Sequence, residues 1–188
     1  MNSPLLRIEG AALVRGGRLL FENLDLKLAA GQAALVTGPN GVGKSSLLRL
    51  AAGLLAATAG HIERAPAALV DEHSALDESL PLGRALGFWA KLDGGDARAG
   101  MEAMGIAHLG DVPVRMLSTG QRKRAALARL IASDRPLWLL DEPANGLDGD
   151  GLDRLARIIA AERKSGRAIL AASHQPIGLG DHQTVELA

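Results

Sequence analysis

Short apolar runs and longer amphipathic stretches alternate along the chain, and each kind of pattern predicts a different element. Apolar runs bounded by turn residues predict strands, and apolar residues at helical spacing predict helices. The predicted strands cover residues 6–14, 24–28, 33–37, 67–71, 137–141, 168–173 and 184–187. The predicted helices cover residues 44–55, 119–132 and 152–164. Strands that alternate with helices favour an α/β fold built on a largely parallel sheet.

Residues 74–117 follow a different pattern, which is mostly helical and contains no strong strand. Gly94-Gly95 and Pro113 interrupt this pattern. We therefore predict one domain over residues 1–188, with a core of residues 1–73 and 118–188 and a helical subdomain of residues 74–117. A chain of 188 residues is long enough to bury such a core without cross-links.

Composition excludes several classes of function. Lys and Arg number 21 and balance 21 Asp and Glu, so the chain lacks the basic excess typical of nucleic-acid binding. It has no cysteine, which excludes disulfides and thiolate metal sites. The first ten residues lack the pattern of a targeting segment, and residues 47–59 are too short and too polar to span a bilayer. We therefore expect any membrane role to come through a partner.

The segment between the strand at 33–37 and the helix at 44–55 matches the Walker A phosphate-binding loop. Its glycines allow backbone N–H groups to turn inward around a polyanion, and the helix that follows adds its positive end. We expect Lys44 to reach the β and γ phosphates of ATP and the Ser45 hydroxyl to bind Mg²⁺. A chance glycine-rich turn is the alternative, and the strand-loop-helix context argues against it. The predicted nucleotide-binding residues are Gly38, Pro39, Asn40, Gly41, Val42, Gly43, Lys44, Ser45 and Ser46.

Two acidic residues end the apolar strand at 137–141, and a histidine follows the strand at 168–173. Asp141 at the strand tip suits the Mg²⁺ shell, and Glu142 suits a base that orients the attacking water. His174 suits a hydrogen bond to the γ-phosphate or to that water. By themselves these could be solvated acids and a structural histidine. After a Walker A loop, a catalytic set of Lys44, Glu142 and His174 is the better interpretation.

Residues 117–121 read Leu-Ser-Thr-Gly-Gln and resemble the signature motif of ABC ATPases. Ser118 and Gln121 also form a capping box, so an ordinary helix start is the alternative reading. The signature motif is followed closely by the strand at 137–141 and then by residues 145–148, which resemble the D-loop and end at Asp148. The ATP-binding subunits of ABC transporters have the same order of motifs. The resemblance implies that Ser118, Gly120, Gln121 and Asp148 contact nucleotide across a dimer of two copies that sandwich ATP.

A narrower resemblance points to the ATP-binding subunits of the haem exporter of cytochrome c maturation, the CcmA type. It rests on the Phe88-Trp89 pair, on Pro-Leu-Trp-Leu-Leu-Asp-Glu-Pro at 136–143, and on His-Gln-Pro at 174–176. This family implies a P-loop NTPase core with a small antiparallel β region and an inserted helical subdomain. It also implies an ATPase that uses ATP and Mg²⁺, peripheral on the cytoplasmic face of the bacterial inner membrane and docked on membrane-spanning subunits. No direct haem binding and no nucleic acid are expected.

Three positions depart from the ABC pattern. His73 stands where most members have a glutamine that contacts Mg²⁺ or water, which puts the coupling to the membrane subunit in doubt. Arg15 falls near the usual place of an adenine-stacking aromatic, so its guanidinium would have to stack on the base. Thr119 replaces the first glycine of the signature, which we expect to be tolerated.

Other functions stay open beside haem export. The chain could serve another small ABC exporter, or it could be a regulatory module that clamps nucleotide with little turnover. The soluble ABC ATPases of DNA repair and translation fit less well, because they have long coiled-coil insertions or two cassettes in one chain. The chain shows neither feature.

Overall fold

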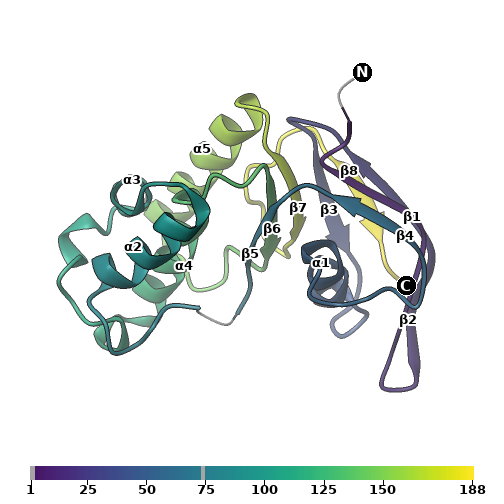
Figure 1. Ribbon diagram of the computed structural model, residues 1–188, viewed down its shortest axis with the longest axis horizontal. Helices are drawn as coiled ribbons and strands as arrows, with labels where there is room; N and C mark the ends of the chain where they lie inside the picture. Colours follow the sequence, from purple (N-terminus) through teal and green to yellow (C-terminus); the bar gives the residue numbers. More distant parts are fainter. Residues whose placement is uncertain (1–2, 73–74) are drawn as a thin grey trace.

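The computed structural model describes residues 3–72 and 75–188. A five-stranded parallel sheet forms the centre of the fold (Figure 1). The strand order is β5-β6-β7-β3-β8. The strands are β3 (Ala33–Thr37), β5 (Ala67–Val70), β6 (Leu137–Asp141), β7 (Ala168–Ala172) and β8 (Gln183–Glu186). All neighbouring pairs are parallel, which confirms the predicted α/β fold. β6 and β7 are buried throughout, as expected for strands covered on both faces.

Alternate residues of β6 face two different hydrophobic cores. Leu137 and Leu139 pack with α1 (Lys44–Ala52), whereas Trp138 and Leu140 pack with α4 (Thr119–Ile131) and α5 (Gly149–Lys164). A strand with a period of two can serve both cores only if every residue is apolar. This is why the apolar run at 137–141 identified the strand correctly.

A second sheet of three antiparallel strands lies beside the first, in the order β2-β1-β4. It consists of β1 (Leu6–Arg15), β2 (Arg18–Leu28) and β4 (Ala59–Arg64). The tight turn at Gly16-Gly17 has positive φ at both residues, which suits a two-residue hairpin and starts β2 six residues before the predicted strand. β4 was not predicted, because its polar, largely exposed residues form a strand only by pairing with β1.

Two core helices differ from prediction at their ends because of capping. α1 ends at Ala52, three residues early, because Gly53 adopts the left-handed conformation that stops a helix. α5 begins at Gly149, three residues early, because the Asp148 side chain accepts a hydrogen bond from the Gly151 N–H at 2.9 Å.

A group of helices lies between β5 and β6 in the sequence and projects to the side away from the antiparallel sheet (Figure 1). These are α2 (Leu82–Asp93), α3 (Ala97–Ala103), the 3₁₀ turns η1 (Ala107–Leu109) and η2 (Val114–Met116), and α4. α3 approaches α4 so closely at Gly100 that an added Cβ would lie 2.2 Å from the Ala128 carbonyl oxygen. The division of the chain into a core and a subdomain of residues 74–117 stays a prediction. Within the described ranges, none of the helices has both the length and the apolar character needed to cross a bilayer.

Candidate functional site

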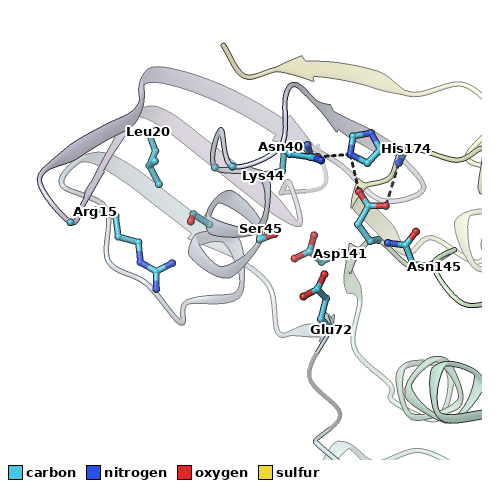
Figure 2. Close-up of a pocket in the computed structure, with 14 residues that line it drawn as sticks. Arg15, Leu20, Asn40, Lys44, Ser45, Glu72, Asp141, Asn145 and His174 are labelled. Atoms are coloured by element: carbon cyan, nitrogen blue, oxygen red, sulfur yellow. Dashed lines mark hydrogen bonds and ion pairs between the residues drawn. The ribbon is translucent and has the colours of Figure 1, made fainter. Parts of the chain in front are cut away.

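A cleft of about 620 Å³ opens at the carboxyl ends of the central strands, where α1 begins (Figure 2). The phosphate loop follows β3, Asp141 and Glu142 lie at the end of β6, and His174 follows β7. Parallel strands bring these ends to one edge of the sheet, which is where α/β folds bind ligands. The lining consists of Arg15, Gly16, Leu20, Asn40, Gly41, Gly43, Lys44, Ser45, Ser46, Glu72, Asp141, Glu142, Asn145 and His174.

The loop between β3 and α1 forms a cradle that suits a phosphate chain. Gly38 and Gly43 have φ of 138° and 126°, and a Cβ on Gly38 would lie 2.3 Å from the Leu187 carbonyl oxygen. Gly43 is the N-cap of α1 and offers no side chain, so the first turn is left for a ligand rather than a side-chain cap. Lys44 Nζ donates to the carbonyl oxygens of Gly38 at 2.7 Å and Pro39 at 3.1 Å. The ammonium group therefore lies across the cradle.

Asp141 and Ser45 bring together two oxygen-bearing side chains of the kind that Mg²⁺ prefers as ligands. The Asp141 residue is only 5% exposed, and the Ser45 hydroxyl hydrogen-bonds to its carboxylate. Burial raises the pKa of Asp141, while the Ser45 hydrogen bond and the nearby Arg49 charge act in the opposite direction. A buried carboxylate beside a hydroxyl fits Mg²⁺, whose charge would offset this cost.

Glu142 is held in an unusual backbone conformation. Its φ is 45°, a left-handed value that is uncommon for a residue other than glycine and costs free energy. The Glu142 N–H donates to the Ala172 carbonyl oxygen at 2.8 Å, which fixes this turn against the end of β7. Its side chain is 14% exposed and turns towards His174. The strained turn therefore directs the carboxylate into the cleft.

His174 connects the carboxylate to the phosphate loop. Its backbone N–H donates to Glu142 Oε2 at 3.3 Å, and its Nε2 lies 3.5 Å from Glu142 Oε1. The same Nε2 lies 3.1 Å from Asn40 Oδ1, as the dashed lines in Figure 2 show. The remaining histidines that the structure describes, at positions 61, 108 and 182, are exposed.

The structure adds four residues to the cleft that were not proposed as site residues. Gly16 and Leu20 come from the β1–β2 hairpin. Leu20 lies with Arg15 at one end of the cleft (Figure 2). Glu72 follows the end of β5, and Asn145 belongs to the D-loop-like segment. The position of Glu72 after a predicted parallel strand was a usable signal, since neighbouring strand ends share one edge.

Several predicted residues do not line the cleft. The Val42 side chain is buried in the core, and Gly38 and Pro39 contribute carbonyl oxygens to Lys44. Ser118 and Gln121 form the predicted capping box, with hydrogen bonds of 2.9 and 3.2 Å. Ser118, Gly120, Gln121 and Asp148 lie outside the lining, and their roles towards a second copy stay predictions. His73 falls outside the described residues.

A smaller cavity of about 260 Å³ adjoins the cleft and shares Glu72, Glu142 and Asn145 with it. Lys123 of α4 lines this cavity, so a cation from the signature helix lies among the carboxylates at the ends of β5 and β6. Burial lowers the pKa of Lys123, and the nearby Asp141 and Glu142 charges oppose that effect. The carboxylates of Asp141 and Glu142 therefore lie near the positive charge of Lys123 on α4 and share the cleft with Lys44 of the phosphate loop.

Comparison with known proteins places the chain in a family. Residues 21–145 match the family model described as ABC transporter. A cytochrome c biogenesis ATP-binding export protein CcmA from Sphingopyxis alaskensis is 54% identical over 181 residues, covering 94% of this chain and 93% of that protein. A protein of the same name from Zymomonas mobilis is 50% identical over 185 residues, covering 97% and 84%. A solved structure described as the ATP binding subunit of an ABC transporter shares the fold, with a TM-score of 0.88 and 20% identity over 97% of this chain and 85% of that chain. The chain therefore belongs to the ABC transporter family, and within it to the CcmA family of cytochrome c biogenesis ATP-binding export proteins.

Proposed function

We propose that this chain binds and hydrolyses ATP as a subunit of an exporter that serves cytochrome c biogenesis, with haem delivery as the supported process. The observation that carries the ATPase part is the arrangement of Lys44, Glu142 and His174 around one cleft with a phosphate cradle. The relatives' names, which specify ATP binding, export and cytochrome c biogenesis, support the second part.

The side chains in the cleft suit phosphoryl transfer to water. When nucleotide binds, the Lys44 ammonium would exchange its hydrogen bonds to the Gly38 and Pro39 carbonyl oxygens for contacts with the β and γ phosphates, whose negative charge it would neutralise. The Glu142 carboxylate orients a water for attack on the γ-phosphate and accepts a proton from that water. His174 holds that carboxylate and is placed to donate to a γ-phosphate oxygen. Such catalysis depends mainly on positioning and charge stabilisation, both of which a strained, hydrogen-bonded Glu142 favours.

Ser45 and Asp141 are the residues proposed to hold Mg²⁺. When bound, Mg²⁺ would help to stabilise the negative charge of the phosphates during hydrolysis. The Ser45 hydroxyl and the Asp141 carboxylate are already in contact, so neither has to be brought from elsewhere in the fold.

Two kinds of partner belong to the proposal. A second copy of the chain would complete each ATP site with the helix start at Ser118, Gly120 and Gln121 and with the loop at Asp148. Membrane-spanning transporter subunits would receive the conformational change and hold the chain at the cytoplasmic face of the bacterial inner membrane. We propose no direct haem binding and no nucleic-acid partner. The core of residues 1–73 and 118–188, with a helical subdomain of residues 74–117, is part of the same proposal.

Steady-state ATP hydrolysis, with and without the membrane partner, tests the enzymatic part. We expect measurable turnover that Glu142→Gln reduces at least about 100-fold while ATP still binds. If the wild-type chain is inactive in both states and indistinguishable from Glu142→Gln, a nucleotide clamp without turnover is the better description.

Identification of the membrane proteins that copurify with the chain tests the transport part. Partners that release haem, or a haem-loaded chaperone, in an ATP-dependent manner support the proposal. Partners with an unrelated cargo would assign the chain to another small ABC exporter.

A further inference from the structure

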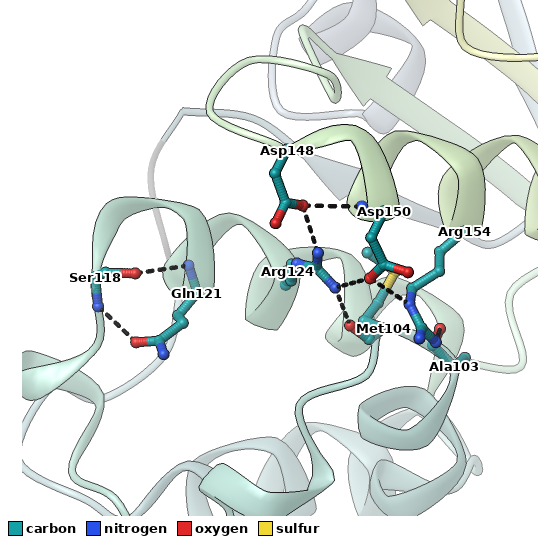
Figure 3. A network of polar contacts seen from close by, with 9 residues as sticks. Ala103, Met104, Ser118, Gln121, Arg124, Asp148, Asp150 and Arg154 are labelled. Atoms are coloured by element: carbon teal, nitrogen blue, oxygen red, sulfur yellow. Dashed lines mark hydrogen bonds and ion pairs between the residues drawn. The ribbon is translucent and has the colours of Figure 1, made fainter.

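A single guanidinium joins three elements beside the start of α4. The Arg124 side chain is 12% exposed and projects from α4 towards the start of α5 (Figure 3). Its Nη1 donates at 2.9 Å to Asp150 Oδ2 and at 2.9 Å to the Met104 carbonyl oxygen, and its Nη2 donates to Asp148 Oδ1. Met104 is the C-cap of α3, and Asp148 is the N-cap of α5. Arg124 therefore connects α4 with the ends of two other helices.

A second guanidinium reinforces the same junction. Arg154 Nε donates to Asp150 Oδ2 at 2.7 Å, and its Nη1 donates to the Ala103 carbonyl oxygen at 3.3 Å (Figure 3). Two cations thus bind the carbonyl end of α3, where the helix dipole favours positive charge. They also bind the first turn of α5, where the dipole favours the Asp150 carboxylate. Asp150 is shared by both arginines, so the contacts form one network.

The loop of residues 145–148 lies between this network and the nucleotide cleft. Asn145 lines the cleft, and Asp148 at the other end of the loop accepts from Arg124. In the middle, a Cβ added to Gly120 would lie 3.1 Å from the Gly146 carbonyl oxygen, so the loop rests directly on the first turn of α4. That turn carries the Ser118–Gln121 capping box.

We propose that Arg124 is a positioning residue that makes the loop of residues 145–148 and the first turn of α4 move as one body. A planar guanidinium with several donors can hold Asp148, Asp150 and a backbone carbonyl together, whereas a lysine ammonium has three donors at one point. Asp148 and Asp150 are 69% and 55% exposed, so the arrangement depends on the three acceptors that one guanidinium holds together and not on burial of the ion pairs.

This inference rests on the proposed function and adds a route for communication between two ATP sites. A nucleotide in the cleft meets Asn145 and Glu142 at one end of the body that Arg124 holds together. The capping-box turn at the other end is the part proposed to face nucleotide in the second copy. Movement of the loop on binding or hydrolysis would therefore shift the surface offered to the second site, and cooperativity in ATP would depend on Arg124.

Two variants of the full-length chain separate the ion pair from the helix cap. Arg124→Met removes all three contacts of the guanidinium. Asp148→Asn removes the charge opposite Arg124 but keeps an oxygen that can accept from the Gly151 N–H, since asparagine is a good N-cap. Arg98→Met is the matched control, because Arg98 pairs with Glu102 within α3 and its side chain is 83% exposed.

Hydrogen exchange and steady-state kinetics provide the two measurements. We expect Arg124→Met to raise exchange of the amides of residues 118–122 and 145–151 together, by about tenfold, because both segments lose the same restraint. The dissociation constant for ATP should stay within about twofold of wild type, because Arg124 does not line the cleft. The kcat should fall by about tenfold and the Hill coefficient for ATP should approach 1. Arg124→Lys should lie between wild type and Arg124→Met, and Arg98→Met should match wild type.

The outcomes distinguish this inference from the proposed function. If exchange rises in only one segment, or in neither, the two segments do not move as one body and the inference is overturned. Unchanged kcat and Hill coefficient in Arg124→Met would overturn it as well. Should Arg124→Met fail to fold, Asp148→Asn decides by the same exchange measurement. A wild-type chain without turnover would contradict the proposed function, while the exchange data would still decide the role of Arg124.

Discussion

Glu142 and His174 hold each other across the ends of two neighbouring strands. The His174 N–H donates to one carboxylate oxygen of Glu142, and its imidazole Nε2 lies 3.5 Å from the other. Because the same imidazole contacts Asn40 of the phosphate loop at 3.1 Å, a change at the phosphate position can reach the carboxylate through one side chain. The backbone turn at Glu142, with φ of 45°, sets the direction in which its side chain leaves the end of β6.

Loss of the His174 imidazole should therefore affect catalysis much more than binding. We expect His174→Ala to lower kcat by about 100-fold, while KM for ATP changes less than about tenfold. His182→Ala is the control, because His182 is exposed and its Nδ1 lies 2.6 Å from the Gly180 carbonyl oxygen of its own loop, away from the cleft lining. Steady-state kinetics of both variants provide the test. Equal loss in both, or a large rise in KM with unchanged kcat, would contradict a catalytic role.

Removal of the charge on Asp141 should stabilise the chain when no Mg²⁺ is bound. Burial raises the pKa of Asp141 in the folded state, so its protonated form is favoured, and that stability is lost as the pH rises through the folded pKa. Asp141→Asn resembles the protonated form. With a chelator at pH 7, its free energy of unfolding should be about 1 kcal/mol higher than that of wild type.

The difference should shrink as the pH falls towards the usual aspartate range of about 4, where wild-type Asp141 is protonated as well. Exposed Asp153 on α5 offers the control, and Asp153→Asn should leave the unfolding temperature unchanged. With Mg²⁺ and ATP the order should reverse, because only wild type keeps the carboxylate ligand. Thermal unfolding over this pH range would refute the idea if Asp141→Asn were the less stable protein without metal.

Nucleotide base selectivity should be weak. None of the four aromatic residues, all of which the structure describes, lines the cleft, and Arg15 and Leu20 lie at the end where a base would sit. An arginine plane and a leucine can contact any base, so KM for ATP and GTP should agree within about fivefold. Arg15→Ala should raise both KM values by a few-fold, whereas Arg18→Ala, outside the cleft, should change neither. A preference for ATP of 100-fold or more would show recognition by other groups.

Gly87 inside α2 and Gly95 just after its end should respond oppositely to substitution by alanine. A Cβ on Gly95 would lie 1.6 Å from the Ala132 carbonyl oxygen, so Gly95→Ala must push α4 away and should cost about 3 kcal/mol or more. Gly87 lies inside α2 with nothing within 4 Å of the added atom, and Gly87→Ala should stabilise by about 0.5–1 kcal/mol. Denaturant unfolding of the two variants measures both effects. Similar destabilisation in both would refute the close packing at Gly95.

The strands around the cleft were predictable because both of their faces are buried. β3 and β6 have the predicted ends, since apolar residues stop where the chain leaves the sheet. β4 was missed because Ile62 is its only large apolar residue and its partner β1 lies some fifty residues away. The ends of α1 and α5 were misplaced although Gly53 and Asp148 are typical stop and start residues. A closer use of capping signals would have corrected both.

The sequence by itself determined the chemistry of this protein. A lysine, a serine, two acids and a histidine stand in motifs whose local strand and turn patterns are short-range properties. Only the tertiary structure decided which of these groups meet. Glu142 and His174 are 32 residues apart, and Arg124 and Asp148 are 24 apart. Their contacts exist because β6 pairs with β7 and because α4 packs beside the start of α5. Contacts of this kind depend on strand order and helix packing, which no local pattern of residues specifies.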